Sequence, residues 1–215
     1  MRRSFLSMAL LMVFASVIVE AQTSRSAANY FNRANDRYAG GDLDGAIADF
    51  DIAIAFDHRL ALAYNNRGIA RQDRGDLDGA ISDYDYAIKI NPRLAEAHNN
   101  RGVARRARGD LDGAMADYDS SIKLNPQHTN AYNNRGNLWR EKGRMEEAIA
   151  DYNKAIALNP RLAIAYASRG LVRLLQGKVG EAEQDFSLCI KLDSRLKPYI
   201  EARIKEINRH PAPKR

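Results

Sequence analysis

Small residues return along this chain at a constant interval of 34 residues. One such column consists of the glycines Gly68, Gly102, Gly136 and Gly170, and parallel columns hold alanine and proline. A fixed period of this length is typical of a solenoid, in which one unit is too small to bury its apolar face and stacked neighbours supply the core. The period defines five units: residues 27–60, 61–94, 95–128, 129–162 and 163–196.

Two helices are predicted within each unit. In the second unit, the apolar residues between Leu77 and Ile88 are spaced by three and four, which places them on one helix face. Gly75, a helix-stop residue followed by an acidic helix start, separates this segment from an earlier helical half. Pro92 ends the second half. Each unit is therefore expected to be two helices joined by tight turns.

The repeated pattern A-Y-x-N-R-G-x-A, followed by G-D-x-D-x-A-I-x-D-Y-x-x-A-I-x-x-N-P, resembles the tetratricopeptide repeat. The resemblance covers residues 27–196. In the second unit the family's signature places are held by Gly68, Ala80, Tyr84, Ala87 and Pro92. The resemblance implies an all-α fold, a right-handed solenoid of five helix pairs in which the first helices line a concave binding groove.

Both ends of the chain depart from the repeat. Residues 1–21 have a basic start, an apolar run too short to span a bilayer, and small residues before a cleavage site, which is the layout of a secretory signal peptide. We expect export, with an uncleaved anchor as the alternative, and a bacterial periplasm because the remaining sequence has no N-glycosylation sequon. The other terminal segments are predicted to be a linker (22–26), a capping helix (197–208) and a disordered tail (209–215).

Charge and composition restrict the chemistry. The formal net charge of +6 permits an anionic partner, but 33 basic residues are interleaved with 27 acidic ones, which favours an ordinary mixed-charge surface. The four histidines stand singly, and no metalloprotease, nucleophile-elbow or phosphate-loop spacing occurs. Cys189 is the single cysteine and stands in a column of small residues, which indicates a core position. We expect no enzyme activity, no cofactor and no metal.

Two charged columns run through all five units. An arginine precedes each glycine-column position, and an aspartate precedes each second-helix aromatic residue. An arginine and an aspartate are sixteen residues apart within a unit, and eighteen residues separate an aspartate from the next arginine. The columns are either a ladder for polyanions or partly buried ion pairs, and their matching numbers favour ion pairs. The central members are Arg67, Asp83, Arg101, Asp117, Arg135 and Asp151.

Polar residues on the first helices are the candidates for ligand contacts. Asparagine both donates and accepts hydrogen bonds, so a row of amides suits the backbone of an extended peptide. Groove asparagines contact peptides in the family that the chain resembles; the alternative is that these amides only bond neighbouring helices. The predicted groove residues are Asn65, Asn66, Ile69, Gln72, Asn99, Asn100, Val103, Arg106, Asn133, Asn134, Asn137 and Arg140.

The sequence thus predicts a non-catalytic scaffold that binds a protein or an extended peptide, as an adaptor or assembly factor of the cell envelope. Nucleic acid and small-molecule substrates are not expected partners, and a membrane is expected only if the N-terminal segment is retained. The alternatives are polyanion binding through the arginine columns and an accessory subunit of a cell-envelope enzyme. The first alternative requires affinity that falls steeply with salt.

Overall fold

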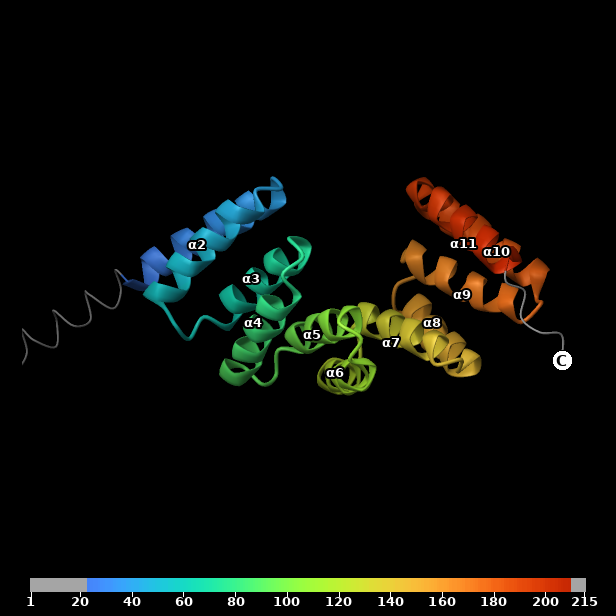
Figure 1. Ribbon diagram of the computed structural model, residues 1–215, viewed down its shortest axis with the longest axis horizontal. Coiled ribbons are helices and arrows are strands. Elements are labelled where there is room, and N and C mark those ends of the chain that lie inside the picture. Colours follow the sequence, from blue (N-terminus) through green and yellow to red (C-terminus); the bar gives the residue numbers. More distant parts are fainter. Residues whose placement is uncertain (1–22, 210–215) are drawn as a thin grey trace, which may run out of the picture. The chain divides into compact units, whose positions relative to one another are not determined.

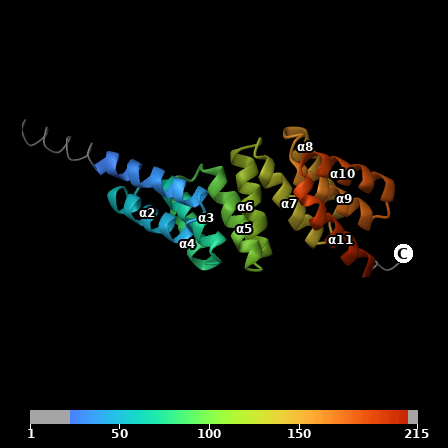
Figure 2. The same ribbon diagram turned by 90° about the horizontal axis from the view of Figure 1, so that it is seen from above.

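The computed structural model describes residues 23–209, and within this range every regular element is helical (Figures 1 and 2). A first helix covers residues 23–39, and a short 3-10 helix covers Ser194–Leu196. The labelled helices are α2 (Leu43–Phe56), α3 (Ala61–Asp73), α4 (Leu77–Ile90), α5 (Ala95–Ala107), α6 (Leu111–Leu124), α7 (Thr129–Glu141), α8 (Met145–Leu158), α9 (Ala163–Leu175), α10 (Val179–Leu192) and α11 (Lys197–Arg209).

These bounds follow the 34-residue period of the sequence. The first helices α3, α5, α7 and α9 each have 13 residues, and the second helices α2, α4, α6, α8 and α10 each have 14. Consecutive helices pack as pairs, so the predicted all-α fold of tetratricopeptide type is confirmed. Residues 23–26, expected to be a linker, are helical. The predicted signal peptide and residues 210–215 lie outside the described residues.

The turn between paired helices depends on a glycine and an aspartate. Gly75 has a φ of 93°, a left-handed conformation that costs a residue with a side chain more than it costs glycine. Asp76 then caps α4, because its carboxylate accepts a hydrogen bond from the backbone N–H of Gly79 at 2.9 Å. The predicted stop at Gly75 is therefore a real helix end.

The glycine column sets the distance between the helices of a pair. A Cβ atom added at Gly68 would lie 2.7 Å from Cε1 of Tyr84, which is fully buried. The same clash would arise between Gly136 and Tyr152, also at 2.7 Å. Glycine on the first helix therefore makes room for the aromatic ring of the second, as close packing of the core demands.

The chain divides into two compact units, Met1–Arg108 and Gly109–Arg215. The division falls between α5 and α6, inside the third repeat. In the first unit α3 packs on both α2 and α4, and α4 packs on α5. In the second unit α7 packs on α6 and α8, and α9 on α8 and α10. Each unit is described by itself below; the handedness of the solenoid and a groove along all five repeats stay predictions.

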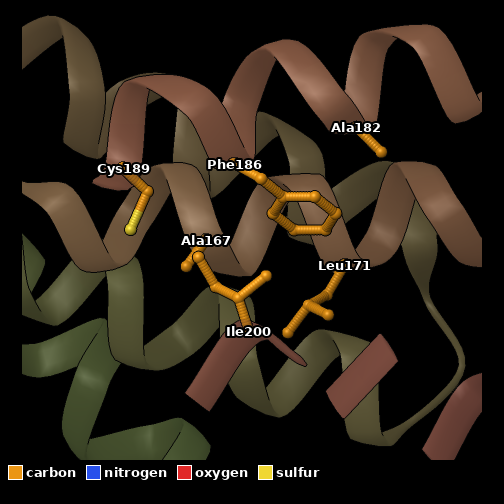
Figure 3. Packing of buried hydrophobic residues seen from close by; sticks show 6 residues of the cluster. All are labelled: Ala167, Leu171, Ala182, Phe186, Cys189 and Ile200. Atoms are coloured by element: carbon orange, nitrogen blue, oxygen red, sulfur yellow. The ribbon is translucent and has the colours of Figure 1, made fainter. Parts of the chain in front are cut away.

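The last helix completes the core of the second unit. α11 packs against α9, and Ile200, which is 2% exposed, joins the cluster of Ala167, Leu171, Phe186 and Cys189. Figure 3 shows that residues of α10 and Ile200 of α11 approach α9 from opposite sides. Burial raises the pKa of the Cys189 thiol, as suits a core residue. Among residues 23–209, no helix has the length and apolar character needed to cross a membrane.

Candidate functional site

The arginine that precedes the glycine column is held by two aspartates. In α3, Arg67 donates to both carboxylate oxygens of Asp83 on α4, from Nε at 3.0 Å and from Nη2 at 2.6 Å. Its Nη1 donates to Asp51 on α2, in the preceding repeat. Asp83, which is 1% exposed, also accepts from Nη1 of Arg71 at 2.8 Å. Arg67 therefore ties together three consecutive helices, α2, α3 and α4.

The same arrangement recurs in both units. Every column pair that the structure describes joins residues sixteen apart, so the pairing lies within a repeat and not across the eighteen-residue interval. The shortest contacts are Arg33–Asp49 at 2.6 Å, Arg67–Asp83 at 2.6 Å, Arg135–Asp151 at 2.7 Å and Arg169–Asp185 at 2.6 Å. Arg101 and Asp117 belong to different units, so their pairing stays a prediction.

Sequence reasoning missed the second set of acids. Asp51, Asp85 and Asp119 contact the arginine of the following repeat, and Asn153 does so in place of an acid. Each stands two residues after the aspartate column and sixteen residues before the arginine it contacts. Their 34-residue period was visible in the sequence, and it could have indicated a bridge between repeats.

These contacts keep the arginines of the column protonated, and they pair each positive charge with a carboxylate. Burial alone would lower the pKa of Arg67, but hydrogen bonds and charge from Asp83 and Asp51 outweigh it and raise the pKa. Hydrogen bonding to Asp151 raises the pKa of Arg135, and hydrogen bonding from Arg33 lowers the pKa of Asp49. The arginines that precede the glycine column are thus mostly engaged in internal ion pairs, which leaves little free positive charge for a polyanion.

A chain of amide hydrogen bonds links the asparagines of the first unit. From its Nδ2 atom, Asn66 donates to Oδ1 of Asn35 at 2.9 Å, and Asn65 donates to Oδ1 of Asn66 at 3.0 Å. On α5, Asn100 donates to Asn65 at 3.1 Å, and Asn99 donates to Asn100 at 3.3 Å. We call this chain the asparagine ladder. Its amides all donate in the same direction, from α5 towards the helix of residues 23–39.

The two amide rows predicted from the sequence have different exposure. Asn65 and Asn99 are buried, at 4% and 6% exposed, whereas Asn66 and Asn100 are half-buried. A half-buried asparagine in the ladder uses one N–H and one lone pair, so it keeps a second N–H and a second lone pair. Asn66 and Asn100 are therefore the ladder residues suited to a ligand, and Asn65 and Asn99 hold them in place.

In the second unit the row ends at an unsatisfied acceptor. Asn133 on α7 is 6% exposed, and its Oδ1 atom is buried without a hydrogen-bond partner among the described residues. In the first unit the matching atom, Oδ1 of Asn65, accepts from Asn100, which is 35 residues later. The residue 35 places after Asn133 is Ser168, whose short side chain replaces the asparagine of that column.

Other predicted groove residues also have internal contacts. Oε1 of Gln72 accepts from the hydroxyl of Tyr84 at 3.3 Å, and Oδ1 of Asn137 accepts from that of Tyr152 at 2.9 Å. Their NH₂ groups stay available as donors. The remaining predicted groove residues are half-buried: Ile69, Val103, Arg106, Asn134 and Arg140. We call the half-buried predicted residues of the first unit the amide face: Asn66, Ile69, Gln72, Asn100, Val103 and Arg106.

One more contact joins the first two repeats. The hydroxyl of Tyr38 donates to Oδ2 of Asp73, at the end of α3, at 2.6 Å. This hydrogen bond raises the pKa of Tyr38 to about 12, because losing the proton would place a phenolate beside a carboxylate. Residues 23–209 contain no group of three or more His, Cys, Asp or Glu side chains arranged to bind a metal ion.

The comparisons with known proteins agree with this architecture. A family profile described as tetratricopeptide repeat matches residues 65–128, and one described as TPR repeat matches residues 136–177. No curated protein sequence matches the chain.

Several solved structures are similar. MamA is 25% identical with a TM-score of 0.64, over 77% of this chain and 97% of that one. A thermophilic repeat protein of Thermus thermophilus is 18% identical with a TM-score of 0.71, over 83% and 99%. The first repeat domain of Spaghetti, bound to the HSP90 peptide SRMEEVD, is 25% identical with a TM-score of 0.54, over 56% and 95%.

Proposed function

Because this chain is a tetratricopeptide-repeat protein, we propose that it is a non-catalytic scaffold that binds an extended peptide along the amide face. The observation that carries the proposal is the asparagine ladder, whose half-buried amides are held in fixed orientations and keep unused hydrogen-bonding capacity. A preorganised donor and acceptor loses little conformational freedom when a ligand binds. An extended peptide backbone offers both complementary groups at regular intervals.

Two further observations support a peptide ligand. The repeat domain of Spaghetti, which has 25% identity to this chain, was solved with a bound peptide. In addition, the half-buried Gln72 of the same face accepts from Tyr84 through its carbonyl oxygen and keeps its NH₂ group as a donor for a ligand. Polyanion binding through the arginine columns is a weaker proposal, because those arginines are engaged by Asp83, Asp151 and their equivalents.

We further propose that the protein acts at the cell envelope, as an adaptor or an assembly factor in a bacterial periplasm. The support is the pattern of residues 1–21, which has the layout of an export signal. Fractionation of cells that produce the full chain tests this part. Recovery of the protein in the cytoplasm at its unprocessed mass would contradict it.

Selection from a library of unstructured peptides tests the binding proposal. The peptide with the highest affinity is measured against the wild type and an Asn66→Ala/Asn100→Ala variant, which we expect to bind about tenfold more weakly. Asn130→Ala is the matched control, since Asn130 is an exposed asparagine of α7 outside the ladder. Circular dichroism melts verify that the variants are folded.

A photo-crosslinking residue gives an independent measurement. Placed at position 100 it should capture the selected peptide, and placed at position 130 it should not. Equal capture at both positions, or unchanged affinity in the double variant, would show that the amide face is not the binding surface.

A further inference from the structure

A hollow in the first unit has a chemistry unlike that of the amide face. It lies where the loop between α2 and α3 meets the end of α4, and its volume is about 410 Å³. It contains none of the asparagines of the ladder. We call it the basic hollow, and its lining consists of His58, Arg59, Tyr64, Tyr86, Lys89 and Ile90.

Positive charge in the basic hollow is not neutralised. His58, Arg59 and Lys89 are exposed, and within residues 23–209 none of their side chains has an ion-pair partner. The acid adjacent in sequence, Asp57, accepts a hydrogen bond from the backbone N–H of Arg59 at 2.9 Å. These basic side chains therefore differ from Arg67, whose charge is paired with that of Asp83.

An aromatic surface stands beside these charges. The rings of Tyr64 and Tyr86 stack with centroids 5.5 Å apart and an interplanar angle of 23°. The guanidinium carbon of Arg67 lies 5.4 Å from the centre of the Tyr64 ring. Tyr64 is thus held by two neighbours, whereas Tyr86 remains 50% exposed. The exposed ring of Tyr86 is available for stacking with a further aromatic group.

The repeat fold does not require the residues that give this hollow its character. At the position of His58 the next three repeats have Pro92, Pro126 and Pro160. At the position of Tyr86 the first repeat has Ile52, and the third to fifth repeats have Ser120, Lys154 and Leu188. The other repeats form the same helix pairs without His58 and Tyr86. Both departures from the repeat line the same hollow, which points to a role outside folding.

We propose that the basic hollow binds an acidic peptide segment that contains an aromatic side chain. Arg59 and Lys89 bind its carboxylates, and the aromatic ring packs on Tyr86. The site is small, and the neighbouring helices carry the half-exposed acids Asp51 and Asp85. Within a volume of about 410 Å³ only a few side chains fit, so a short acidic peptide is a better match than a long polyphosphate chain.

Isothermal titration with the blocked peptide acetyl-Asp-Glu-Trp-Glu-Asp-amide tests the proposal. We expect saturable binding to the wild type, weakened by added salt, and binding at least about fivefold weaker for acetyl-Asn-Gln-Trp-Gln-Asn-amide. Replacing the tryptophan of the acidic peptide by alanine should also weaken binding, since the ring would no longer pack on Tyr86.

Variants taken from other repeats are compatible with the helix pair. Arg59→Gln and Lys89→Ala introduce the residues found at Gln127 and Ala157, and together they should weaken binding about tenfold. Tyr86→Ser, which copies Ser120, should weaken it about fivefold. Arg93→Gln is the matched control: Arg93 occupies the place of Arg59 in the next repeat, and its loss should change affinity less than twofold.

Four results would overturn the proposal. The first is unchanged affinity in the Arg59→Gln/Lys89→Ala variant, and the second is equal binding of the neutral peptide. The third is tighter binding of a ten-nucleotide thymidine strand with the same dependence on these variants, which would assign the hollow to nucleic acid. The Asn66→Ala/Asn100→Ala variant should bind the acidic peptide normally. A loss there is the fourth result, and it would place the peptide on the amide face instead.

Discussion

Helices α3 and α9 hold equivalent places in their repeats, but the side chains at matching positions of one helix face differ. On α3 these positions are Asn65 and Ile69, beside the half-buried Asn66. On α9 they are Ala167 and Leu171, which are 0% and 1% exposed because α11 packs over them. The polar face of α3 keeps donors and acceptors that make no internal hydrogen bond, whereas the apolar face of α9 is covered by α11 of the same chain. One repeat scaffold can therefore leave a polar helix face uncovered or bury an apolar one under a further helix, according to the residues on that face.

Helix α11, which packs over α9, starts where the first helix of a further repeat would start. α11 begins at Lys197, 34 residues after α9 begins at Ala163, so it holds the place of a sixth first helix. It packs mainly on α9, however, whereas first helices within the array, such as α5, pack extensively on the preceding second helix. This shift is what covers Leu171.

The largest effect is expected from breaking the covered face. Ile200→Asp would place a charge in the apolar cluster of α9 and α11 and should lower the free energy of unfolding by about 4 kcal/mol. Urea denaturation gives the free energy, and hydrogen exchange should show lost protection in α9 and α11 but not in α3. Ala202→Asp, at an exposed position of α11, is the control. Equal loss of protection in α3 would show that the two faces are not independent.

Removal of a buried acid on the α3 side should have the next largest effect. Asp83→Ala leaves Arg67 and Arg71 without their shared carboxylate and should cost about 3 kcal/mol. Asp85→Ala, at a carboxylate that is 51% exposed, should cost less than about 1 kcal/mol. Chemical denaturation of both variants provides the comparison. Equal costs would mean that burial of Asp83 contributes nothing to the strength of its ion pairs.

The ladder permits a finer comparison between the two units. Asn65→Ala removes one amide that both donates and accepts, and it leaves groups of Asn66 and Asn100 unpaired. Asn133→Ala removes a carbonyl that has no hydrogen-bond partner within residues 23–209, so it should cost about 1 kcal/mol less than Asn65→Ala. The difference is measurable from denaturant midpoints at equal slopes. A larger cost for Asn133 would indicate that its carbonyl has a partner in solution.

The smallest effect is a dependence on pH at the start of the array. The folded-state pKa of Asp49 is lowered by its hydrogen bond to Arg33, so the contribution of this pair is present above the unfolded pKa of about 3.9 and is lost as pH falls through the folded value. Thermal melts between pH 2 and 7 should show that the wild type has the higher melting temperature above about pH 4, and that its difference from Asp49→Asn disappears below that pH. A constant difference across that range would contradict the assignment.

The fold could be predicted because its determinants are local or periodic. Gly75 ends a helix through its own backbone conformation, and the glycine at the place of Gly68 recurs in the next three repeats, where a ring such as that of Tyr84 must fit. The arginine and aspartate columns were equally visible, but choosing between the sixteen- and eighteen-residue pairings required the packing of the helices. Asp51 was missed because its partner belongs to another repeat.

The candidate site was less predictable, because exposure depends on helix rotation. Asn65 and Asn66 are adjacent in sequence and differ by about 100° around the helix, so one is buried and the other is half-buried. The hydrogen bonds of the ladder that connect different helices join residues 31 and 35 apart. No local sequence pattern distinguishes an asparagine that makes such a bond from one that contacts a ligand. The burial of Leu171 depends on where α11 packs, which its periodicity alone does not determine.

The asparagine ladder gives the amide face a sense of direction. Because Asn66, Asn65, Asn100 and Asn99 all donate towards the N-terminal helix, their amide dipoles are aligned head to tail. A peptide backbone also has a direction, with its own carbonyl and N–H groups in fixed order. If a peptide binds along this face as proposed, its two opposite orientations present different hydrogen-bonding groups to the ladder, even where its side chains are ignored. A scaffold of this kind can select which end of its partner comes first.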